Sequence, residues 1–210
     1  GVNGSGMHVH QSLWNKDKNA FFDKNGKYSL SDTALYFIGG QLKYIKEIIS
    51  ILAPTVNSYK RLVPGYEAPV YICWGRRNRS SLIRVPEYFI GREKSTRAEL
   101  RCPDSSCNPY LAFSVMLRAG LEGIKNEIEP PNPVDEDVYE FDEAKLKEFY
   151  IDQLPGSLGE AIELTERGTI AKEALGEHVF TRFIEGKKEE WKEFTMTVTN
   201  WEWSKYLPIL

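Results

Sequence analysis

The chain has 210 residues, of which 41% are hydrophobic, and carries a formal net charge of -3. A chain of this length buries roughly 70% of its unfolded surface on folding, which is enough for one sizeable core. Its acidic balance offers no general positive charge to a polyanion, so we do not expect nucleic acid as a partner. No run approaches the roughly 20 apolar residues of a membrane span, so we expect no membrane association. The three cysteines cannot all pair, and a reducing cytoplasm suits them best.

The first strong periodic pattern covers residues 31–52. Apolar residues recur there at alternating steps of three and four, which is typical of an amphipathic helix, and Pro54 ends the run. Farther along, Asn108 and Pro109 predict a second helix, because asparagine caps a helix and proline suits its first turn. We expect this second helix to end before the proline cluster at residues 129–133.

Other segments predict short strands and further helices. Between the first two helices, three segments rich in β-forming residues predict strands over 70–74, 81–85 and 97–102. The proline cluster is interpreted as a linker between residues 1–128 and 129–210 of the same domain. The second part is predicted to be helical, with helices over 142–150, 158–167 and 179 to about 203. The expected fold class is therefore α+β, with antiparallel β-sheet segments flanked by helices.

Charged residues alternate along the third predicted strand. Residues two apart share one face of a strand, so Arg97, Glu99 and Arg101 would project together, with the carboxylate between two guanidiniums. By the same rule His8 and His10 point the same way, after a glycine-rich loop whose backbone allows close approach of a ligand. Histidines with this spacing supply nitrogen to a divalent cation or hydrogen bonds to phosphate.

A cluster of arginines surrounds the second predicted strand, and it consists of Arg76, Arg77, Arg79 and Arg84. Each of these patterns also has an ordinary explanation. An Arg-Glu-Arg strand face is commonly a structural ion-pair network, and clustered arginines are commonly a solvated face. Taken together, a cation site, several groups that bind anions and a glycine-rich loop are typical of phosphoryl transfer.

Four longer motifs resemble one enzyme family. The run Asn3-Gly-Ser-Gly-Met-His8-Val-His10-Gln-Ser12 closely resembles the glutamate- and ATP-binding loop of glutamine synthetases. Residues 57–69, Asn-Ser-Tyr-Lys-Arg-Leu-Val-Pro-Gly-Tyr-Glu-Ala-Pro, resemble the family's arginine and flap segment. Residues 78–86 resemble its phosphate-binding segment, and residues 99–104 with Asn108-Pro-Tyr-Leu resemble its metal and substrate strand. The motifs occur in the family's order, and the resemblance covers nearly the whole chain.

The resemblance implies a role for each matching residue. The implied metal ligands are His8 and Glu99. The implied ATP-binding residues are His10, Gln11, Ser12, Arg79, Arg84 and Lys94, although the residues around Lys94 match poorly. The implied glutamate-binding residues are Asn3, Gly4, Arg61, Glu67 and Arg101. Glu67 and Arg79 are the implied catalytic residues, with Glu67 on a flap where it binds ammonium and accepts its proton.

The resemblance also implies a reaction and its partners. Glutamate, ATP and ammonium would give glutamine, ADP and phosphate through γ-glutamyl phosphate, with two or more Mg²⁺ or Mn²⁺ ions in each complete active site. The implied assembly is a homo-oligomer, a dodecamer of two hexameric rings. Because the chain opens Gly-Val-Asn-Gly without a methionine, we expect a fragment. The resemblance implies that the missing part includes an N-terminal β-grasp domain and further metal carboxylates. Such a fragment alone is expected to be inactive.

Two other functions fit the same fold. One is a ligase that joins glutamate to an amine, and its nucleotide and glutamate motifs would look alike. The other is a catalytically silent relative, which predicts lost charges at Glu67, Arg79 or Glu99, and all three are present.

Near the end of the chain, the apolar stripe of Trp191, Phe194, Val198 and Trp201 suits either an oligomer contact or packing within the subunit. Tyr139 lies near the position of a regulatory adenylyl group in some relatives, but the residues after it differ, so adenylylation is not favoured.

Overall fold

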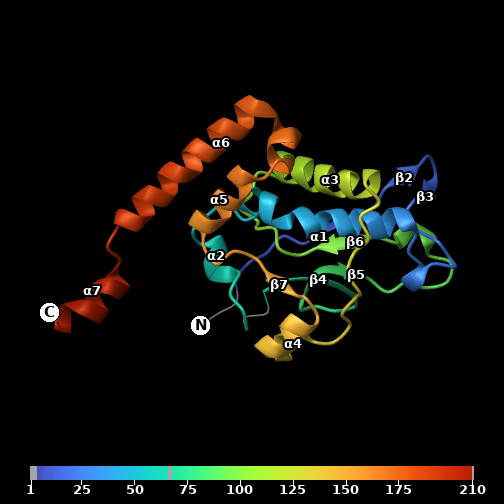
Figure 1. Cartoon of the computed structure of the whole chain (residues 1–210), viewed down its shortest axis with the longest axis horizontal. Helices are drawn as coiled ribbons and strands as arrows, with labels where there is room; N and C mark the ends of the chain where they lie inside the picture. Colours follow the sequence, from blue (N-terminus) through green and yellow to red (C-terminus); the bar gives the residue numbers. More distant parts are fainter. Residues whose placement is uncertain (1–3, 66–67, 210) are drawn as a thin grey trace.

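The structure is a computed structural model that describes residues 4–65 and 68–209 (Figure 1). It has the expected α+β class. The long helices α1 (Asp32–Leu52) and α3 (Pro109–Lys125) lie side by side above a mixed five-stranded sheet. The buried apolar side chains of both helices, the sheet and helix α5 (Leu158–Arg167) form one continuous core.

Helices α1 and α3 begin where the sequence predicts. The Ser31 hydroxyl accepts a hydrogen bond from the Ala34 N–H, and the Asn108 side chain accepts from two N–H groups of the first turn of α3. The two helices cross closely at Gly40 and Gly123, because a Cβ on Gly123 would lie 2.6 Å from the Cα of Gly40. Glycine at both positions thus allows the backbones to touch.

The sheet is ordered β1-β6-β5-β4-β7. Its strands are β1 (Val9–Gln11), β6 (Ala98–Leu100), β5 (Ser81–Val85), β4 (Tyr71–Arg76) and β7 (Asp152–Gln153). Three of these pairings are antiparallel as predicted, but β4 and β5 run parallel. A separate hairpin contains β2 (Trp14–Asn15) and β3 (Lys18–Asn19).

The parallel pair is an addition to the antiparallel segments that the sequence predicts. Parallel neighbours ordinarily need a long crossover, yet only residues 77–80 join β4 to β5. Arg77 adopts a φ of 61°, and the Asn78 amide donates to the Val134 and Glu136 carbonyls at 2.7 and 2.8 Å. The Asn78 Oδ1 also accepts from the Ser80 N–H at 2.8 Å. These contacts with a distant segment turn the short connection back along the sheet.

The segment after the proline cluster packs on the same core. Trp74 of β4 donates from Nε1 to the Pro131 carbonyl at 2.7 Å, and the Val134 N–H donates to the Trp74 carbonyl at 2.8 Å. The division at residues 128 and 129 therefore stays a prediction about regions within one packed unit.

The short helices are α2 (Ser58–Arg61), α4 (Glu143–Glu148), η1 (Lys27–Ser29), η2 (Glu93–Ser95), η3 (Val138–Glu140) and η4 (Leu207–Ile209).

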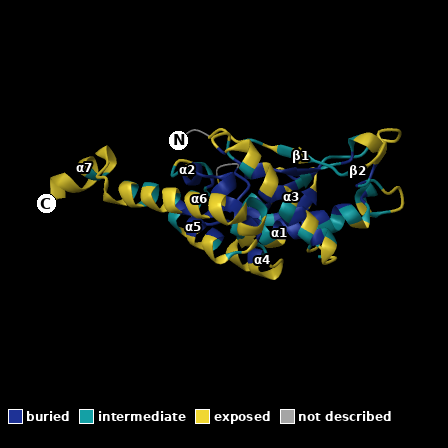
Figure 2. Ribbon diagram, turned by 90° about the horizontal axis from the view of Figure 1, so that it is seen from above, coloured by how far each residue is buried: buried dark blue, intermediate teal, exposed yellow. Residues whose placement is uncertain are grey.

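The C-terminal helices differ from the single long helix that the sequence predicts. Helix α6 (Ile170–Met196) begins earlier than Val179 and kinks at Gly176, where φ is 75°. A break after Met196 separates it from α7 (Asn200–Tyr206). Val198 lies in that break, so the predicted stripe is not one helical face. We call the second half of α6 together with α7 the C-terminal arm (residues 184–206); it runs away from the body and is largely exposed (Figures 1 and 2). No helix in the described ranges is long and apolar enough to span a membrane.

Candidate active site

The register of three strands aligns charged side chains in one row. His10 of β1 lies opposite Glu99 of β6, and Glu99 lies opposite Arg84 of β5. Residues directly opposite one another on neighbouring strands present their side chains on the same face. Glu99 is only 1% exposed, so the row has a buried carboxylate at its centre.

Glu99 contacts cations and a ring nitrogen. Its Oε2 lies 2.5 Å from Arg84 Nε, and its Oε1 lies 3.0 Å from His8 Nδ1 and 3.9 Å from Arg101 Nε. A carboxylate between two guanidiniums is therefore present, but the partners are Arg84 and Arg101. Arg97 precedes β6, and its Nε donates instead to His10 Nδ1 at 3.0 Å. His8, Glu99, Arg84 and Arg101 come together as one cluster, and Arg97 extends it to His10.

The same neighbours change how the histidines titrate. Burial lowers the pKa of His8, the nearby Arg101 lowers it further, and Glu99 opposes both. The pKa of His10 is also lowered by burial, with Arg97 adding to that effect and Glu99 opposing it. Both imidazoles are therefore held neutral near pH 7. Neutral imidazole is the form that coordinates a metal.

His8 and Glu99 fit part of a metal-binding shell. One offers a ring nitrogen and the other a carboxylate oxygen, and the two atoms lie 3.0 Å apart. Within the described ranges, no group of three or more histidine, cysteine, aspartate or glutamate side chains is placed to hold a metal ion. Mg²⁺ requires near-octahedral coordination and takes mostly oxygen ligands. This pair therefore offers two donor atoms, fewer than such a coordination shell needs.

Of the predicted glutamate-binding arginines, Arg101 is buried and Arg61 is partly buried, with its side chain 9% exposed. The Nε of Arg61 and the Nε of Arg101 have no hydrogen-bond partner in the described part of the chain. The Arg101 Nη1 donates to the Arg79 carbonyl, which fixes one edge of its guanidinium. Burial and Arg84 lower the pKa of Arg101, whereas Glu99 raises it. Because an arginine pKa starts so high, the group stays cationic and suits a carboxylate or phosphate oxygen.

A cavity of about 440 Å³ opens beside Arg101. Its lining residues are Arg77, Asn78, Arg79, Ser80, Arg101, Asp135, Asp137 and Tyr139. The predicted catalytic Arg79 is exposed at this cavity, whereas Arg84 is half-buried in the row. The Tyr139 hydroxyl donates to the Ala68 carbonyl at 3.1 Å, so it connects the cavity wall to the residue after Glu67.

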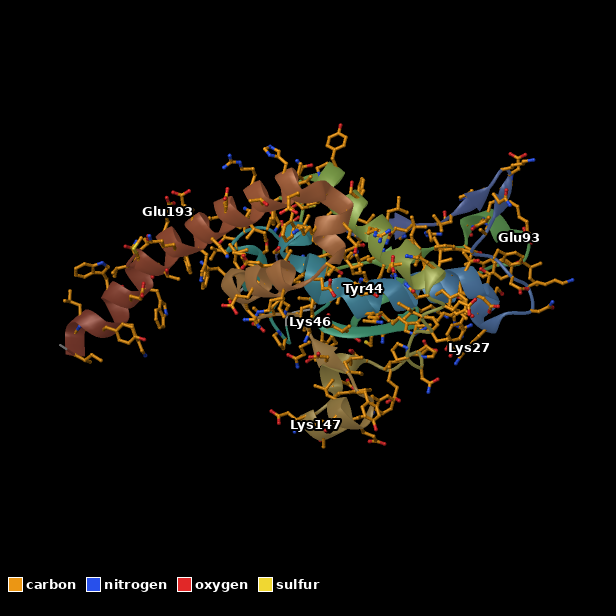
Figure 3. The ribbon with its side chains drawn as sticks, turned by 45° about the horizontal axis from the view of Figure 1, so that its top comes forward. Lys27, Tyr44, Lys46, Glu93, Lys147 and Glu193 are labelled. Carbon is orange, nitrogen blue, oxygen red and sulfur yellow. The ribbon has the colours of Figure 1, made fainter. Side chains whose placement is uncertain are left out.

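The predicted ATP residues of β1 line a second, more apolar cavity of about 390 Å³. Its lining residues are Val9, His10, Gln11, Ser12, Leu13, Phe37, Phe113, Met116 and Leu117. The Gln11 amide pairs with that of the buried Gln41 at 2.8 and 3.1 Å, away from the charged row. Lys94 is exposed on η2; Figure 3 labels its neighbour Glu93 at the end of the molecule that carries the β2–β3 hairpin.

Two predicted site residues, Asn3 and Glu67, lie outside the described residues. Conversely, sequence reasoning did not assign Asp104 to the site, although the structure places it 3.7 Å from Arg61. Its only sequence signal is its position inside the segment that resembles the metal and substrate strand. Arg97 was expected beside Glu99, and no contact with His10 was predicted for it. Its contact with His10 depends on the strand register.

Known proteins match this chain along its length. The family described as glutamine synthetase, catalytic domain, matches residues 1–206. The glutamine synthetase of Thermotoga maritima is 54% identical over 207 residues, which are 99% of this chain and 46% of that protein. The glutamine synthetase of Methanosarcina mazei is 53% identical over 210 residues, with 100% and 46% covered. A solved structure described as a GmaS/ADP complex superposes with a TM-score of 0.85 at 33% identity, covering 98% of this chain and 46% of that one.

The chain thus spans about half the length of these curated relatives, 46% in both cases. The match runs through every motif that contributes to the charged row and to the two cavities. The chain belongs to the glutamine synthetase family, and its residues 1–206 match the model of that family's catalytic domain.

Proposed function

We propose that the complete protein ligates ammonia to the γ-carboxylate of L-glutamate at the expense of ATP, through γ-glutamyl phosphate. The observation that carries the proposal is the row of His10, Glu99 and Arg84, with His8 and Arg101 beside it. It combines neutral imidazoles and a buried carboxylate with guanidiniums, which is the chemistry that phosphoryl transfer to a carboxylate needs. Relatives about half identical to this chain are named glutamine synthetase, which favours ammonia as the acceptor over an amine.

Each part of the site has a task in this proposal. His8 and Glu99 contribute ligands to Mg²⁺ or Mn²⁺, which neutralises charge on the nucleotide phosphates when bound. Arg79 and Arg84 stabilise the negative charge that develops on the transferred phosphoryl group. His10, Gln11, Ser12 and Lys94 bind ATP, and a relative's solved structure is named as an ADP complex, which supports a nucleotide at this fold.

The glutamate side of the site uses the buried arginines. Arg61 and Arg101 bind carboxylate oxygens of glutamate with their planar guanidiniums, and Asn3 and Gly4 complete the contact. Glu67 attracts ammonium and accepts its proton, so that ammonia attacks the acyl phosphate. Carbon–nitrogen bond formation then releases phosphate and leaves glutamine. Exclusion of water from the site protects the activated intermediate from hydrolysis.

We propose that the protein acts in the cytoplasm as a homo-oligomer, a dodecamer of two hexameric rings. The C-terminal arm supports an oligomer, because Trp201 is 63% exposed and Trp203 is 55% exposed. Monomeric proteins rarely expose such apolar groups together. His8 and Glu99 would also occupy only two coordination positions of a metal ion, so other positions remain for ligands from outside residues 1–210. We therefore expect the chain alone to form no glutamine.

An acceptor panel tests the proposal. Purified complete protein is incubated with glutamate, ATP, Mg²⁺ and either ammonium or a series of primary amines, and phosphate and γ-glutamyl product are measured in parallel. We expect ammonium to give the highest kcat/KM. A higher kcat/KM with any amine would refute ammonia as the acceptor, and the absence of every γ-glutamyl product would refute ligase activity altogether.

The Glu67→Ala variant separates the two half-reactions. It removes the proposed proton acceptor while leaving the charged row intact, so glutamine formation should fall by roughly 10²-fold or more. Glutamate-dependent release of phosphate should continue, because the first step does not use Glu67. An equal loss of both products would contradict the assignment of Glu67 to the ammonia step.

A further inference from the structure

Arg61 is held from one side by three consecutive residues. Helix α2 ends at Arg61, whose Nη2 donates to the Cys102 carbonyl and, at 3.1 Å, to the Pro103 carbonyl. On the same side, the Asp104 Oδ2 lies 3.7 Å from the Arg61 Nε. The side chains are only 9% and 13% exposed, so water screens this charge pair far less than a surface pair.

The glycine-rich loop confines Arg61 from the other side. A Cβ on Gly4 would lie 2.9 Å from Arg61 Cγ, and one on Gly6 would lie 2.6 Å from Arg61 Nη1. The loop therefore packs directly on the arginine stem and guanidinium. The Nη1 is directed at this loop, which contains the predicted glutamate-binding Gly4. The orientation of the guanidinium thus decides which nitrogen reaches the substrate side.

Asp104 is itself fixed in place. Its Oδ1 accepts hydrogen bonds from the Ser106 N–H at 2.9 Å and from the Ser106 hydroxyl at 2.7 Å. Its own N–H donates to the Leu52 carbonyl at the end of α1, at 2.8 Å. One carboxylate oxygen is therefore used to hold the local turn. The other oxygen, Oδ2, is left to face Arg61.

We propose that Asp104 is a positioning residue for glutamate binding, acting through Arg61. The Asp104 carboxylate and the two backbone carbonyls hold the Nε and Nη2 edge of the guanidinium, which orients Nη1 toward the glycine-rich loop. The separation of 3.7 Å is too long for a hydrogen bond, so Asp104 orients Arg61 by charge without occupying its Nε–H. This inference rests on the proposed glutamate site.

Two substitutions test the charge of Asp104. Asp104→Asn retains an oxygen for Ser106 but places an amide beside Arg61, whereas Asp104→Glu retains the charge. In the complete enzyme, Asp104→Asn should raise the KM for glutamate about tenfold or more, because the buried guanidinium loses its counter-charge and its orientation. The KM for ATP should stay within about twofold, and Asp104→Glu should recover most of the glutamate KM.

A matched control comes from the surface. Asp152 also pairs with a cation, Lys46 at 2.5 Å, but its side chain is 69% exposed. Asp152→Asn should leave the KM values for glutamate and ATP unchanged. If Asp104→Asn and Asp104→Glu both show the wild-type KM for glutamate, the inference is wrong. Parallel increases in both KM values for Asp104→Asn would also overturn it, because a merely structural defect predicts that result.

A chemical readout separates this inference from the proposed function. Phenylglyoxal modifies guanidiniums, and mass spectrometry gives the labelling rate of Arg61 against that of Arg167, whose side chain is 76% exposed. We expect Asp104→Asn to accelerate labelling of Arg61 about threefold or more, because the variant loses the charge pair that restrains the Arg61 guanidinium. The labelling rate of Arg167 should stay unchanged. Unchanged labelling overturns the inference even if the wild-type enzyme makes no glutamine. Loss of that activity alone would refute only the proposed function.

Discussion

Replacement of Glu99 tests the centre of the charged row. The carboxylate is 1% exposed and faces Arg84, Arg101 and His8. Breaking a buried ion pair by removing one partner costs about 3–5 kcal/mol, because the remaining charge stays buried without compensation. The Arg84 side chain is 26% exposed, so solvent screens part of this loss. We therefore expect Glu99→Ala to lower the free energy of unfolding by about 3 kcal/mol.

That loss should be visible in thermal unfolding. For a domain of this size, about 3 kcal/mol corresponds to a decrease in Tm of roughly 6–12 °C. Glu99→Gln keeps the shape and an acceptor oxygen, so its decrease should be smaller. Mn²⁺ should raise the Tm of the wild-type enzyme, since a ligand that binds the folded state stabilises it. It should have little effect on the Tm of either variant, because both lack the Glu99 carboxylate.

The control is Lys147→Ala, at an exposed residue of α4 that Figure 3 labels away from the C-terminal arm. It should leave both the Tm and its response to Mn²⁺ unchanged. If Glu99→Ala unfolds within about 2 °C of the wild type, the buried charges do not depend on Glu99 and the energetic reasoning is wrong. If Mn²⁺ stabilises Glu99→Ala as much as the wild type, Glu99 is not a metal ligand.

Two further predictions concern helix packing and pH. Gly123→Ala should destabilise the protein by about 1–3 kcal/mol, because the added Cβ would meet the α1 backbone. Gly186→Ala should instead stabilise it by about 0.5–1 kcal/mol, because nothing lies within 4 Å of a Cβ at that position. Denaturant unfolding measures both, and equal effects would contradict the close crossing of α1 and α3. The lowered pKa of His8 means that the unfolded state binds more protons below about pH 6.5, so stability should decrease as the pH falls through the folded-state pKa. His8→Gln should flatten this decrease in Tm measured from pH 8 to 5, and an unchanged slope would contradict it.

Local sequence signals predict several elements closely. The predicted strand at 81–85 coincides with β5, and the predicted helix at 158–167 coincides with α5. Caps and periodicity depend only on neighbouring residues, which explains their success. The parallel β4–β5 pair depends on Asn78 contacting carbonyls more than fifty positions away, and no local pattern encodes that contact. The start of α6 was missed because Gly176 interrupts its periodicity inside the helix.

The candidate site likewise contains some contacts that the sequence predicts and others that depend on the folded structure. The two predicted metal ligands, His8 and Glu99, lie 3.0 Å apart, and Gly4 packs on Arg61, which is also predicted to bind glutamate. The sequence predicts Arg97 as a partner of Glu99, but the structure has Arg84 in that place. The pairing of β5 with β6 brings Arg84 opposite Glu99, and this pairing cannot be derived from positions along β6 alone. Asp104 was missed for a similar reason. Its relation to Arg61 exists only after α2 and the loop following β6 meet at the end of α1.

The alignment of His10 with Glu99 also has a consequence for the order of folding. The two residues are partners across β1 and β6 although they are 89 positions apart (99 − 10), so closing this loop carries a substantial entropic cost. If His8 and Glu99 bind a metal as proposed, their affinity depends on this non-local pairing, which is slow compared with helix formation. A one-residue slip of β1 would turn His10 to the other face of the sheet. During refolding, recovery of metal binding should therefore lag behind recovery of helical circular dichroism.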